Sequence, residues 1–348
     1  PHILHYNERM RIDGRDVSDA EIIASFERVE AVRGDEELTY FEFGTLAALV
    51  VFADAGMDTL ILEVGMGGRL DAVNAVEPTA GLITNIALDH CAWLGDSIEA
   101  IAFEKAGIMR PDKPVVFGAR DVPLAIFDHA ETVGARLQVA GRDFDWQVDG
   151  DTWSWQGRNH NLDELALPAL AGQHQVSNAA AVLALLEASG HDDILTADVV
   201  STALRRVHLD GRIQEIDNDT RWIVDVAHNP AAAEVLAAEL AEQPVSGQTI
   251  AIVGMLDDKD VEGVVTHLQP HVDQWLAVAA DSHRAISADE LARRVANVTG
   301  SGCLVGDSLE SVLERAEEFA GANDRVLLTG SFYLVGPALN QLYSRRGL

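Results

Sequence analysis

Apolar residues in the first part of the chain form short runs that alternate with helical patterns. Ser18, with Glu21 at the capping-box position, predicts a helix over residues 19–32. The same patterning predicts helices over 41–55 and 96–106, and buried strands over 59–64, 80–86 and 114–117. Alternating helices and buried strands of this kind indicate an open, mostly parallel α/β sheet.

The pattern changes between residues 137 and 167. Apolar positions there alternate around Asp149 and Gly150, which predicts a small antiparallel hairpin. Helices are expected over 177–188 and 197–206, and a second α/β alternation begins near Leu209. Its predicted strands are 222–226, 249–253, 274–279 and 325–329, and its predicted helices are 231–242, 260–268, 288–298 and 308–320. We therefore expect two α/β domains, residues 1–208 and residues 209–348, the second resembling a nucleotide-binding domain.

Composition narrows the class of protein. Apolar residues make up 48% of the 348, which is enough for a core in each domain. A net charge of -31 argues against a nucleic-acid partner, because the phosphate backbone would be repelled. No apolar run is long enough to cross a bilayer, and no secretion signal opens the chain. The only two cysteines, Cys91 and Cys303, form no disulfide framework, so a reducing cytoplasm is the expected location.

The basic residues are unusual, because lysine occurs only at Lys105, Lys113 and Lys259. An acidic, lysine-poor surface suits solubility in high salt, where screening removes self-repulsion. GC-rich coding, which favours arginine, explains the scarcity of lysine equally well.

Polar residues follow two predicted strands of the first domain. Glu63 precedes a glycine-rich turn at residues 65–68, where it could hold Mg²⁺ or only cap a helix. Leu70 occupies the place of the third glycine of a dinucleotide fingerprint, which makes a nicotinamide dehydrogenase a distant alternative. Asp89 and His90 could bind a metal or phosphate, although a single histidine is more often structural.

Three further segments have both a structural and a functional interpretation. Lys105 lies beside a predicted helix end that has Gly107 as its C′ residue, and by itself it is best explained as a solvated charge near a helix C-terminus. Asp225 and His228 share a strand-to-helix turn in which Asn229 caps the helix and Pro230 starts it. Ser331 begins another such turn, which either is capped by the serine or presents backbone N–H groups to an anion.

Together and in this order the segments resemble the folylpolyglutamate synthase/dihydrofolate synthase family, which is related to the Mur peptidoglycan ligases. The resemblance runs along the whole chain. Its strongest stretches are PHILHYNERMRIDG, LTYFEFGTLAA, ILEVGMGGRLDAVN, ITNIALDHCAWLG, EKAGI, GQHQVSNAAA, GRIQ, DVAHNP and LLTGSFY. It implies a P-loop-NTPase-type parallel-sheet domain followed by a smaller Rossmann-like ligase domain.

The resemblance also implies roles for single residues. Glu63 and His90 look like ligands of Mg²⁺, and Lys105 resembles a lysine that is carbamylated in this family. The positions matching the pterin pocket are Thr39, Phe41, Asp71 and Ala72. Asn178 matches a residue near the adenine, and Arg212 one that reaches the γ-phosphate across the domain interface. The positions matching the nucleotide and glutamate side of the second domain are Asp225, His228, Ser331 and Tyr333.

The implied reaction is ATP-dependent ligation of glutamate to dihydropteroate, to tetrahydrofolate, or to both. The folate carboxylate attacks the γ-phosphate to give an acyl phosphate, which the glutamate amine converts to an amide. Such chemistry needs positioning and charge neutralisation rather than a protein nucleophile. The expected partners are these small molecules, with ATP and Mg²⁺, and the family suggests a monomer.

One family motif is absent, since no Gly-Lys pair of a G-x-x-G-K-[ST] phosphate loop occurs in these residues. In the family that loop precedes the segment PHILHYNER, so we expect a partial chain that is inactive alone. Two alternatives stay open: a Mur-type ligase acting on a peptidoglycan precursor, and a non-catalytic ligand-binding protein descended from the ligase. The segments TYFEF and GMGGRLDA favour the folate branch.

Overall fold

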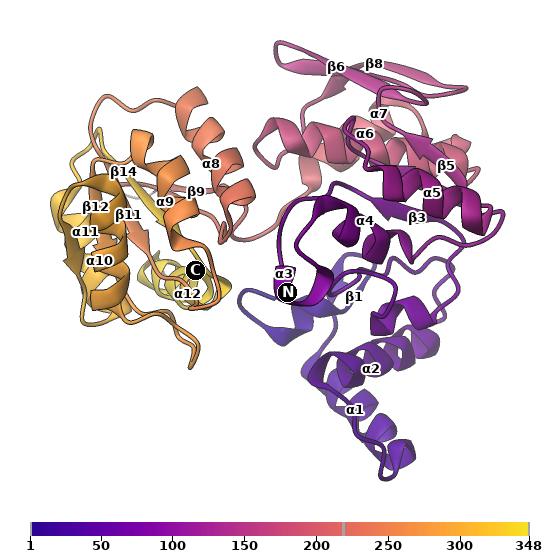
Figure 1. The fold of residues 1–348 in the computed structure, drawn as a ribbon, viewed down its shortest axis with the longest axis horizontal. Helices are drawn as coiled ribbons and strands as arrows, with labels where there is room; N and C mark the ends of the chain where they lie inside the picture. The colour runs from indigo at the N-terminus through magenta and orange to yellow at the C-terminus, as the bar shows by residue number, and fades with distance from the viewer. Residues whose placement is uncertain (1, 218–219, 347–348) are drawn as a thin grey trace. The chain divides into compact units, whose positions relative to one another are not determined.

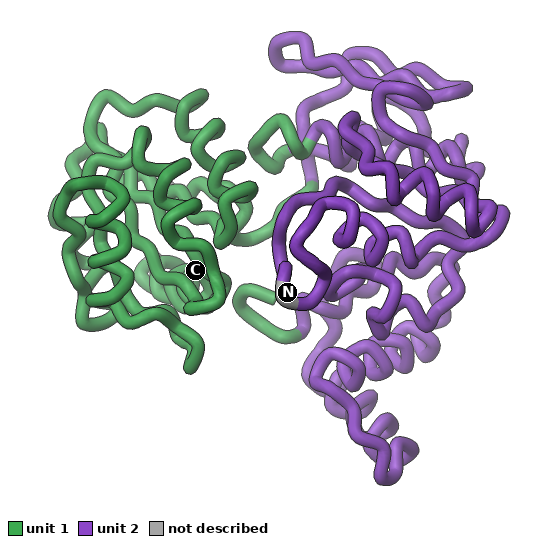
Figure 2. Tube along the Cα trace, in the orientation of Figure 1, with its two compact units in different colours: residues 1–6, 169–175, 207–348 green, residues 7–168, 176–206 purple. Residues whose placement is uncertain are grey.

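The computed structural model describes residues 2–217 and 220–346, which form two compact units (Figure 2). Unit 1 comprises the described parts of residues 1–6, 169–175 and 207–348, and unit 2 comprises residues 7–168 and 176–206. The units divide the chain close to the predicted boundary at residue 208. Two short segments, 1–6 and 169–175, belong to unit 1 although they precede that boundary in the sequence.

Unit 1 is built on a six-stranded sheet with the strand order β13-β12-β11-β14-β10-β9. Its strands are β9 (Gln214–Asp217), β10 (Arg221–Val224), β11 (Thr249–Val253), β12 (Gln274–Ala277), β13 (Cys303–Val305) and β14 (Arg325–Thr329). All neighbours pair in parallel except β9, which runs antiparallel to β10. The last strand, β14, lies between β10 and β11, so the segments that follow β10 and β14 leave the same edge of the sheet.

Helices cover both faces of this sheet (Figure 1). One face packs against α8 (Pro230–Glu242), α9 (Val261–Leu268) and α10 (Ala288–Thr299), and the other against α11 (Leu309–Phe319) and α12 (Phe332–Arg346). Successive strand residues point to opposite faces, so Ile223 packs in the first core and Trp222 in the second. Because both faces are covered, β11 and β14 are buried along their whole length, as a parallel strand usually is.

Unit 2 contains a parallel sheet of β3 (Gly81–Ile83), β4 (Pro114–Phe117) and β5 (Arg136–Val139), packed against α4 (Ile98–Ala106) and α5 (Leu124–Val133). An antiparallel sheet of β6 (Asp145–Asp149), β7 (Thr152–Gln156) and β8 (Asn161–Ala166) packs against α6 (Gln173–Ala188) and α7 (Ala197–Arg206). The remaining helices and strands of unit 2 are α1 (Asp19–Arg33), α2 (Tyr40–Ala55), the short α3 (Cys91–Leu94) and the two-residue strands β1 (Arg11–Ile12) and β2 (Arg15–Asp16). The chain also has the 3-10 helices η1 (Tyr6–Arg9), η2 (Ala72–Ala75) and η3 (Asp192–Ile194), and η4 (Gln269–His271) in unit 1.

Several local predictions are confirmed. Ser18 and Glu21 form the expected capping box at the start of α1. The hairpin around Asp149 and Gly150 joins β6 to β7. Asn229 caps α8, and Pro230 is its first residue. Together with the two covered sheets, these features confirm the two-domain α/β class.

Other predictions are wrong. Residues 59–64 pair with no described strand, and Leu60 and Ile61 are 42% and 92% exposed. A strand exists only where its backbone N–H and C=O groups meet a neighbouring strand, which an apolar run by itself does not supply. The strand expected over 80–86 is only β3, and the helix expected from 96 begins at Ile98 because Ser97 caps it. The helix α5 was not predicted, and of α12 only its start after Ser331 was expected.

Within the described part of the chain, no helix is both long enough and apolar enough to span a membrane.

Candidate functional site

In unit 1, the segment after β10 is fastened to residues 211–213 by the Asp225 side chain. The buried Asp225 carboxylate accepts the backbone N–H of Ile213 at 2.8 Å and that of Ala227 at 2.7 Å. The Val226 N–H donates to the Gly211 carbonyl at 3.0 Å. The predicted site residues Arg212 and Asp225 therefore lie on two segments that are bonded to each other.

Ile213 is held in a strained conformation, with φ at 46°. A positive φ is a genuine outlier for a β-branched residue, and such strain persists only where the surroundings impose it. Here the Asp225 carboxylate holds the Ile213 N–H, and the Ile213 side chain is buried in the core. The strain lies directly beside the exposed side chain of Arg212, and strained backbone of this kind clusters at functional sites.

Burial raises the pKa of Asp225 from 3.8 to about 6, against the opposing effects of the Ile213 and Ala227 N–H groups and the Arg212 charge. A carboxyl group with so high a pKa carries a proton over part of the acidic range. Strongly shifted pKa values gather at functional sites.

His228 lies on the same turn as Asp225. Its Nδ1 is 2.8 Å from the carbonyl oxygen of Val226. A carbonyl can only accept, so Nδ1 carries the hydrogen and Nε2 is the basic nitrogen of the neutral ring. The turn thus presents an imidazole of defined tautomer.

The segment after β14 lies beside this turn. The hydroxyl of Thr329 donates to the Ala227 carbonyl at 3.3 Å, which joins the ends of the two strands. The buried Ser331 starts α12, because its Oγ accepts the Tyr333 N–H at 3.1 Å and its carbonyl accepts the Val335 N–H at 3.0 Å. The capping interpretation of Ser331 is confirmed, and the helix N-terminus it creates remains able to attract an anion. Tyr333 is exposed.

Phe332 is a candidate site residue that the sequence analysis missed. Its ring centroid lies 5.6 Å from the Arg212 guanidinium carbon and 5.9 Å from the centroid of the His228 ring. One aromatic side chain therefore contacts both predicted site residues. The only sequence signal was its position between Ser331 and Tyr333.

His174 also belongs to unit 1 and was not singled out. Its Nδ1 is buried without a hydrogen-bond partner. Burial and then the Arg212 charge lower the pKa of His174, so the ring is neutral near pH 7. Asn178 lies on α6 in the part of that helix that belongs to unit 2, and its side chain is half-buried.

In unit 2, two predicted pterin-pocket residues begin α2. The hydroxyl of Thr39 caps the helix by accepting the Glu42 N–H at 3.2 Å. The Phe41 ring lies against Gly65, since a Cβ atom at Gly65 would come 2.6 Å from Phe41 Cζ. Glycine is needed at position 65 for this close approach.

The other two predicted pocket residues lie on the loop after Gly65. The Asp71 carboxylate accepts the N–H groups of Gly65 and Met66 at 3.0 Å each and that of Val73 at 2.9 Å. Ala72 is the first residue of η2. Asp71 therefore folds the loop, and through Gly65 the loop meets Phe41.

The two predicted metal ligands are both exposed. Glu63 lies in the segment 59–64, which forms no described strand, and His90 lies in the left-handed region with φ 52° and ψ 36°. The His90 backbone N–H donates to Asp89 Oδ1 at 2.8 Å, and His90 Nε2 is 3.9 Å from Asp89 Oδ2. Backbone strain at His90 favours a functional over a structural histidine.

Among the described residues, no group of three or more His, Cys, Asp or Glu side chains is placed to hold a metal ion. Glu63 is a ligand of the type that Mg²⁺ prefers, since the ion binds through one or two carboxylates and completes its shell with phosphate oxygens and water.

Lys105 is half-buried near the end of α4. Burial lowers its pKa, and the nearby negative charge of Asp89 partly opposes this. Lys105 is therefore less exposed to solvent than its place near a helix end predicts. Gly107 ends α4 with φ −60° rather than in the left-handed conformation, and it must be glycine because a Cβ there would lie 2.5 Å from Arg69 Cα.

With this geometry established, comparison with known proteins identifies relatives. Two family models match: the Mur ligase middle domain over residues 20–186, and the Mur ligase glutamate ligase domain over residues 211–332. The Escherichia coli (strain K12) dihydrofolate synthase/folylpolyglutamate synthase is 38% identical over 346 residues, which are 99% of this chain and 79% of that protein.

Two solved structures are similar in fold as well. The E. coli FolC structure in complex with DHPP and ADP has a TM-score of 0.92 at 38% identity, covering 99% of this chain and 81% of that one. A bifunctional folylpolyglutamate synthase/dihydrofolate synthase with Mn, AMPPNP and L-glutamate bound has a TM-score of 0.90 at 40% identity, covering 99% and 81%. The chain therefore belongs to the dihydrofolate synthase/folylpolyglutamate synthase family of Mur ligases, which are ATP-dependent ligases.

Proposed function

We propose that this protein ligates L-glutamate to dihydropteroate, to tetrahydrofolate, or to both, using ATP and an acyl-phosphate intermediate. The observation that carries the proposal is the convergence of Arg212, Asp225 and His228 on bonded segments at the edge of the unit 1 sheet. Ligands of open α/β sheets bind at this edge. The relatives crystallised with DHPP and ADP, and with Mn, AMPPNP and L-glutamate, support the same substrates.

In this proposal, side chains of unit 1 bind ATP and glutamate. Arg212 and Asp225 bind ATP, together with Asn178 on α6. His228, Ser331 and Tyr333 bind glutamate, whose carboxylates suit the positive end of α12. Residues 209–348 accordingly form the glutamate-ligase domain.

The folate substrate belongs to the other domain, residues 1–208, together with ATP. Phe41 offers an aromatic face to the pterin, and Thr39 lies at the start of the same helix. Asp71 and Ala72 contribute through the loop that the Asp71 carboxylate folds. We further propose that the protein acts as a monomer.

Glu63 and His90 would hold Mg²⁺ near the phosphates, where the ion neutralises negative charge. Lys105 would be carbamylated, since CO₂ adds only to a neutral amine and burial lowers the pKa of Lys105. A carbamate replaces the cation with a carboxylate-like group, which suits a hard metal ion.

The reaction then has two displacements. A carboxylate oxygen of the folate forms a bond to the γ-phosphorus as the bond to the β-phosphate oxygen breaks, which releases ADP. The glutamate nitrogen next attacks the acyl carbon, the amine loses a proton, and phosphate leaves. Arg212 would neutralise charge on the transferred phosphoryl group, which is the main task of a protein in such transfers.

The test is an assay of the complete gene product with ATP, Mg²⁺ and glutamate, given either dihydropteroate or tetrahydrofolate with an ¹⁸O-labelled carboxylate. We expect glutamate-dependent ADP formation and transfer of one ¹⁸O atom to the released phosphate. Turnover without ¹⁸O transfer would contradict the acyl phosphate. Turnover only with a peptidoglycan precursor would favour a Mur-type ligase, and substrate binding without turnover would favour a non-catalytic binding protein.

A further inference from the structure

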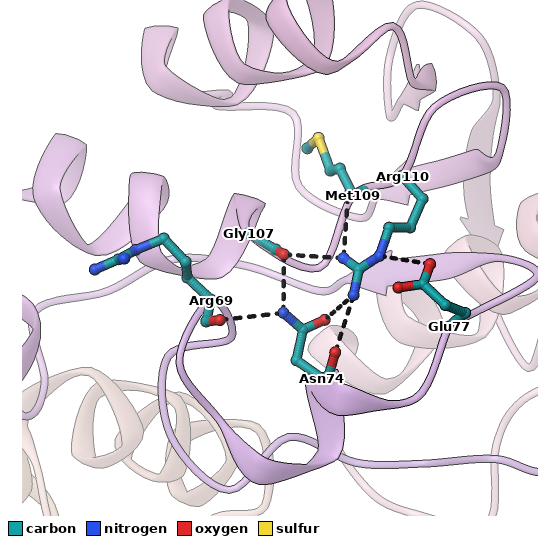
Figure 3. Close-up of polar contacts among 6 residues, drawn as sticks. All are labelled: Arg69, Asn74, Glu77, Gly107, Met109 and Arg110. Atoms are coloured by element: carbon teal, nitrogen blue, oxygen red, sulfur yellow. Dashed lines mark hydrogen bonds and ion pairs between the residues drawn. The ribbon is translucent and has the colours of Figure 1, made fainter.

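Asn74 and Arg110 connect the loop of residues 65–77 to the end of α4 (Figure 3). The Asn74 side-chain amide donates to the carbonyl of Gly107 at 3.0 Å and to that of Arg69 at 3.3 Å. Arg110 donates through Nη2 to Asn74 Oδ1 at 3.0 Å and to the Asn74 carbonyl at 2.9 Å. The two side chains thus bond to each other and to both segments.

All three nitrogens of the Arg110 guanidinium donate hydrogen bonds. Its Nη1 donates to the carbonyls of Gly107 and Met109 at 3.2 Å each, and its Nε pairs with Glu77 at 3.0 Å. The Arg110 side chain is 18% exposed, whereas Glu77 is 80% exposed. The buried contacts are therefore those to Asn74 and to the carbonyls that follow α4, where a cation is favoured by the helix dipole.

The loop and the last turn of α4 approach each other so closely at Gly68 that no larger side chain fits there. A Cβ at Gly68 would lie 2.9 Å from the Glu104 carbonyl oxygen and 3.0 Å from that of Lys105. The Arg69 N–H donates to the Glu104 carbonyl at 2.8 Å, and their side chains form an ion pair of 2.8 Å. The loop and the last turn of α4 thus touch through their backbones.

The loop is also fixed internally, since the Asp71 carboxylate accepts three of its backbone N–H groups. An internally fixed loop bonded to a helix end moves with that helix. The loop carries Asp71 and Ala72, and the helix end carries Lys105.

We propose that Asn74 and Arg110 are positioning residues that hold the pterin-side loop and Lys105 in a fixed relation. The proposal rests on the proposed function, in which the loop binds the folate substrate and Lys105 carries a carbamate. Arg110 is suited to the task because a planar fork can bind several carbonyls at once, which a lysine ammonium cannot reproduce.

The central variants are Asn74→Ala, Arg110→Met and Arg110→Lys. We expect Asn74→Ala and Arg110→Met to raise KM for the folate substrate by about tenfold or more, because a misplacement near 1 Å costs up to about a hundredfold. KM for ATP should change less than about twofold, and Arg110→Lys should be intermediate. The double variant Asn74→Ala/Arg110→Met should be no worse than either single variant, because the pair acts as a unit.

The matched control is Glu77→Gln, which removes the negative charge from the exposed partner of Arg110 and should leave the KM values for the folate substrate, ATP and glutamate unchanged. A second measurement uses ¹³C NMR in ¹³C-bicarbonate. A carbamate signal that is absent in Lys105→Arg should be present in the wild type and weaker in Asn74→Ala.

An unchanged folate KM in folded Asn74→Ala and Arg110→Met would overturn the proposal. The proposal would also fail if kcat fell and the KM values for all substrates rose together, in proportion to the fall in melting temperature. Such a result would mean that the pair only stabilises the fold. If Arg110→Met does not fold, Asn74→Ala and Arg110→Lys decide. If the wild type ligates no glutamate, the proposed function fails, and calorimetric affinity for the folate substrate still tests the pair.

Discussion

The carboxylate of Asp225 holds the backbone N–H of Ile213, twelve positions away, at 2.8 Å. This contact joins Ile213, whose backbone is strained, to Asp225, whose carboxyl group is buried and titratable. Asp225 is therefore both the structural tie between two segments of the candidate site and a source of pH dependence.

The first prediction concerns stability and pH. A carboxyl pKa raised by folding contributes stability that is fully present below the unfolded-state value of 3.8 and is lost as pH rises through about 6. The loss across this window is about 3 kcal/mol. In Asp225→Asn this step should vanish, although an amide cannot accept both N–H groups and the variant should be less stable below pH 4.

Urea unfolding of the protein from pH 3 to pH 8, followed by tryptophan fluorescence, measures this dependence. The exposed Asp307→Asn is the control and should follow the wild type. Identical pH profiles for the wild type and Asp225→Asn would show that Asp225 is not the group that titrates.

The second prediction concerns Phe332, whose ring contacts Arg212 and His228. Cation–π contacts contribute about 1 kcal/mol, so Phe332→Leu should lower kcat/KM by about fivefold to tenfold. Phe332→Tyr should retain most of the activity, because it keeps the aromatic face.

Steady-state kinetics with all three substrates checks this expectation. Phe319→Leu replaces a partly exposed phenylalanine on α11 and should be neutral. Equal activities for Phe332→Leu and the wild type would remove Phe332 from the site.

The third prediction concerns Gly107, where a Cβ would lie 2.5 Å from Arg69 Cα. Gly107→Ala must move backbone, and overpacking of this kind costs about 1–3 kcal/mol. We expect a lower unfolding free energy, measured with urea. Gly302→Ala meets nothing within 4 Å and should be nearly neutral; similar losses for both variants would contradict the steric explanation.

The fourth prediction concerns salt. A net charge of -31 destabilises the compact state by self-repulsion, and the Debye length falls to about 3 Å in 1 M salt. The urea midpoint should therefore rise between 0.1 M and 2 M KCl, and NaCl should act equally if screening is the cause. No gain with either salt would exclude adaptation to high salt.

Local features could be predicted because their physical cause lies within a few residues. The capping box of α1, the start of α8 at Pro230 and the buried strands β11 and β14 follow from side chains next to the backbone they satisfy. The order of these segments also carried the family resemblance.

The site's finer arrangement depends on residues distant in sequence. Asn74 and Arg110 are 36 positions apart, and neither has a local pattern that marks it. Lys105 near a helix end predicts a solvated charge, yet tertiary packing half-buries it and lowers its pKa.

By itself, the sequence determined the alternation of helices and strands, the two-domain α/β class and the ligase family, because periodicity, caps and motif order are local properties. Tertiary structure alone decided that residues 59–64 pair with no described strand, that Asp225 holds Ile213, and that Phe332 contacts both Arg212 and His228. Pairing, burial and shifted pKa values depend on which distant groups come together, and folding brings them together.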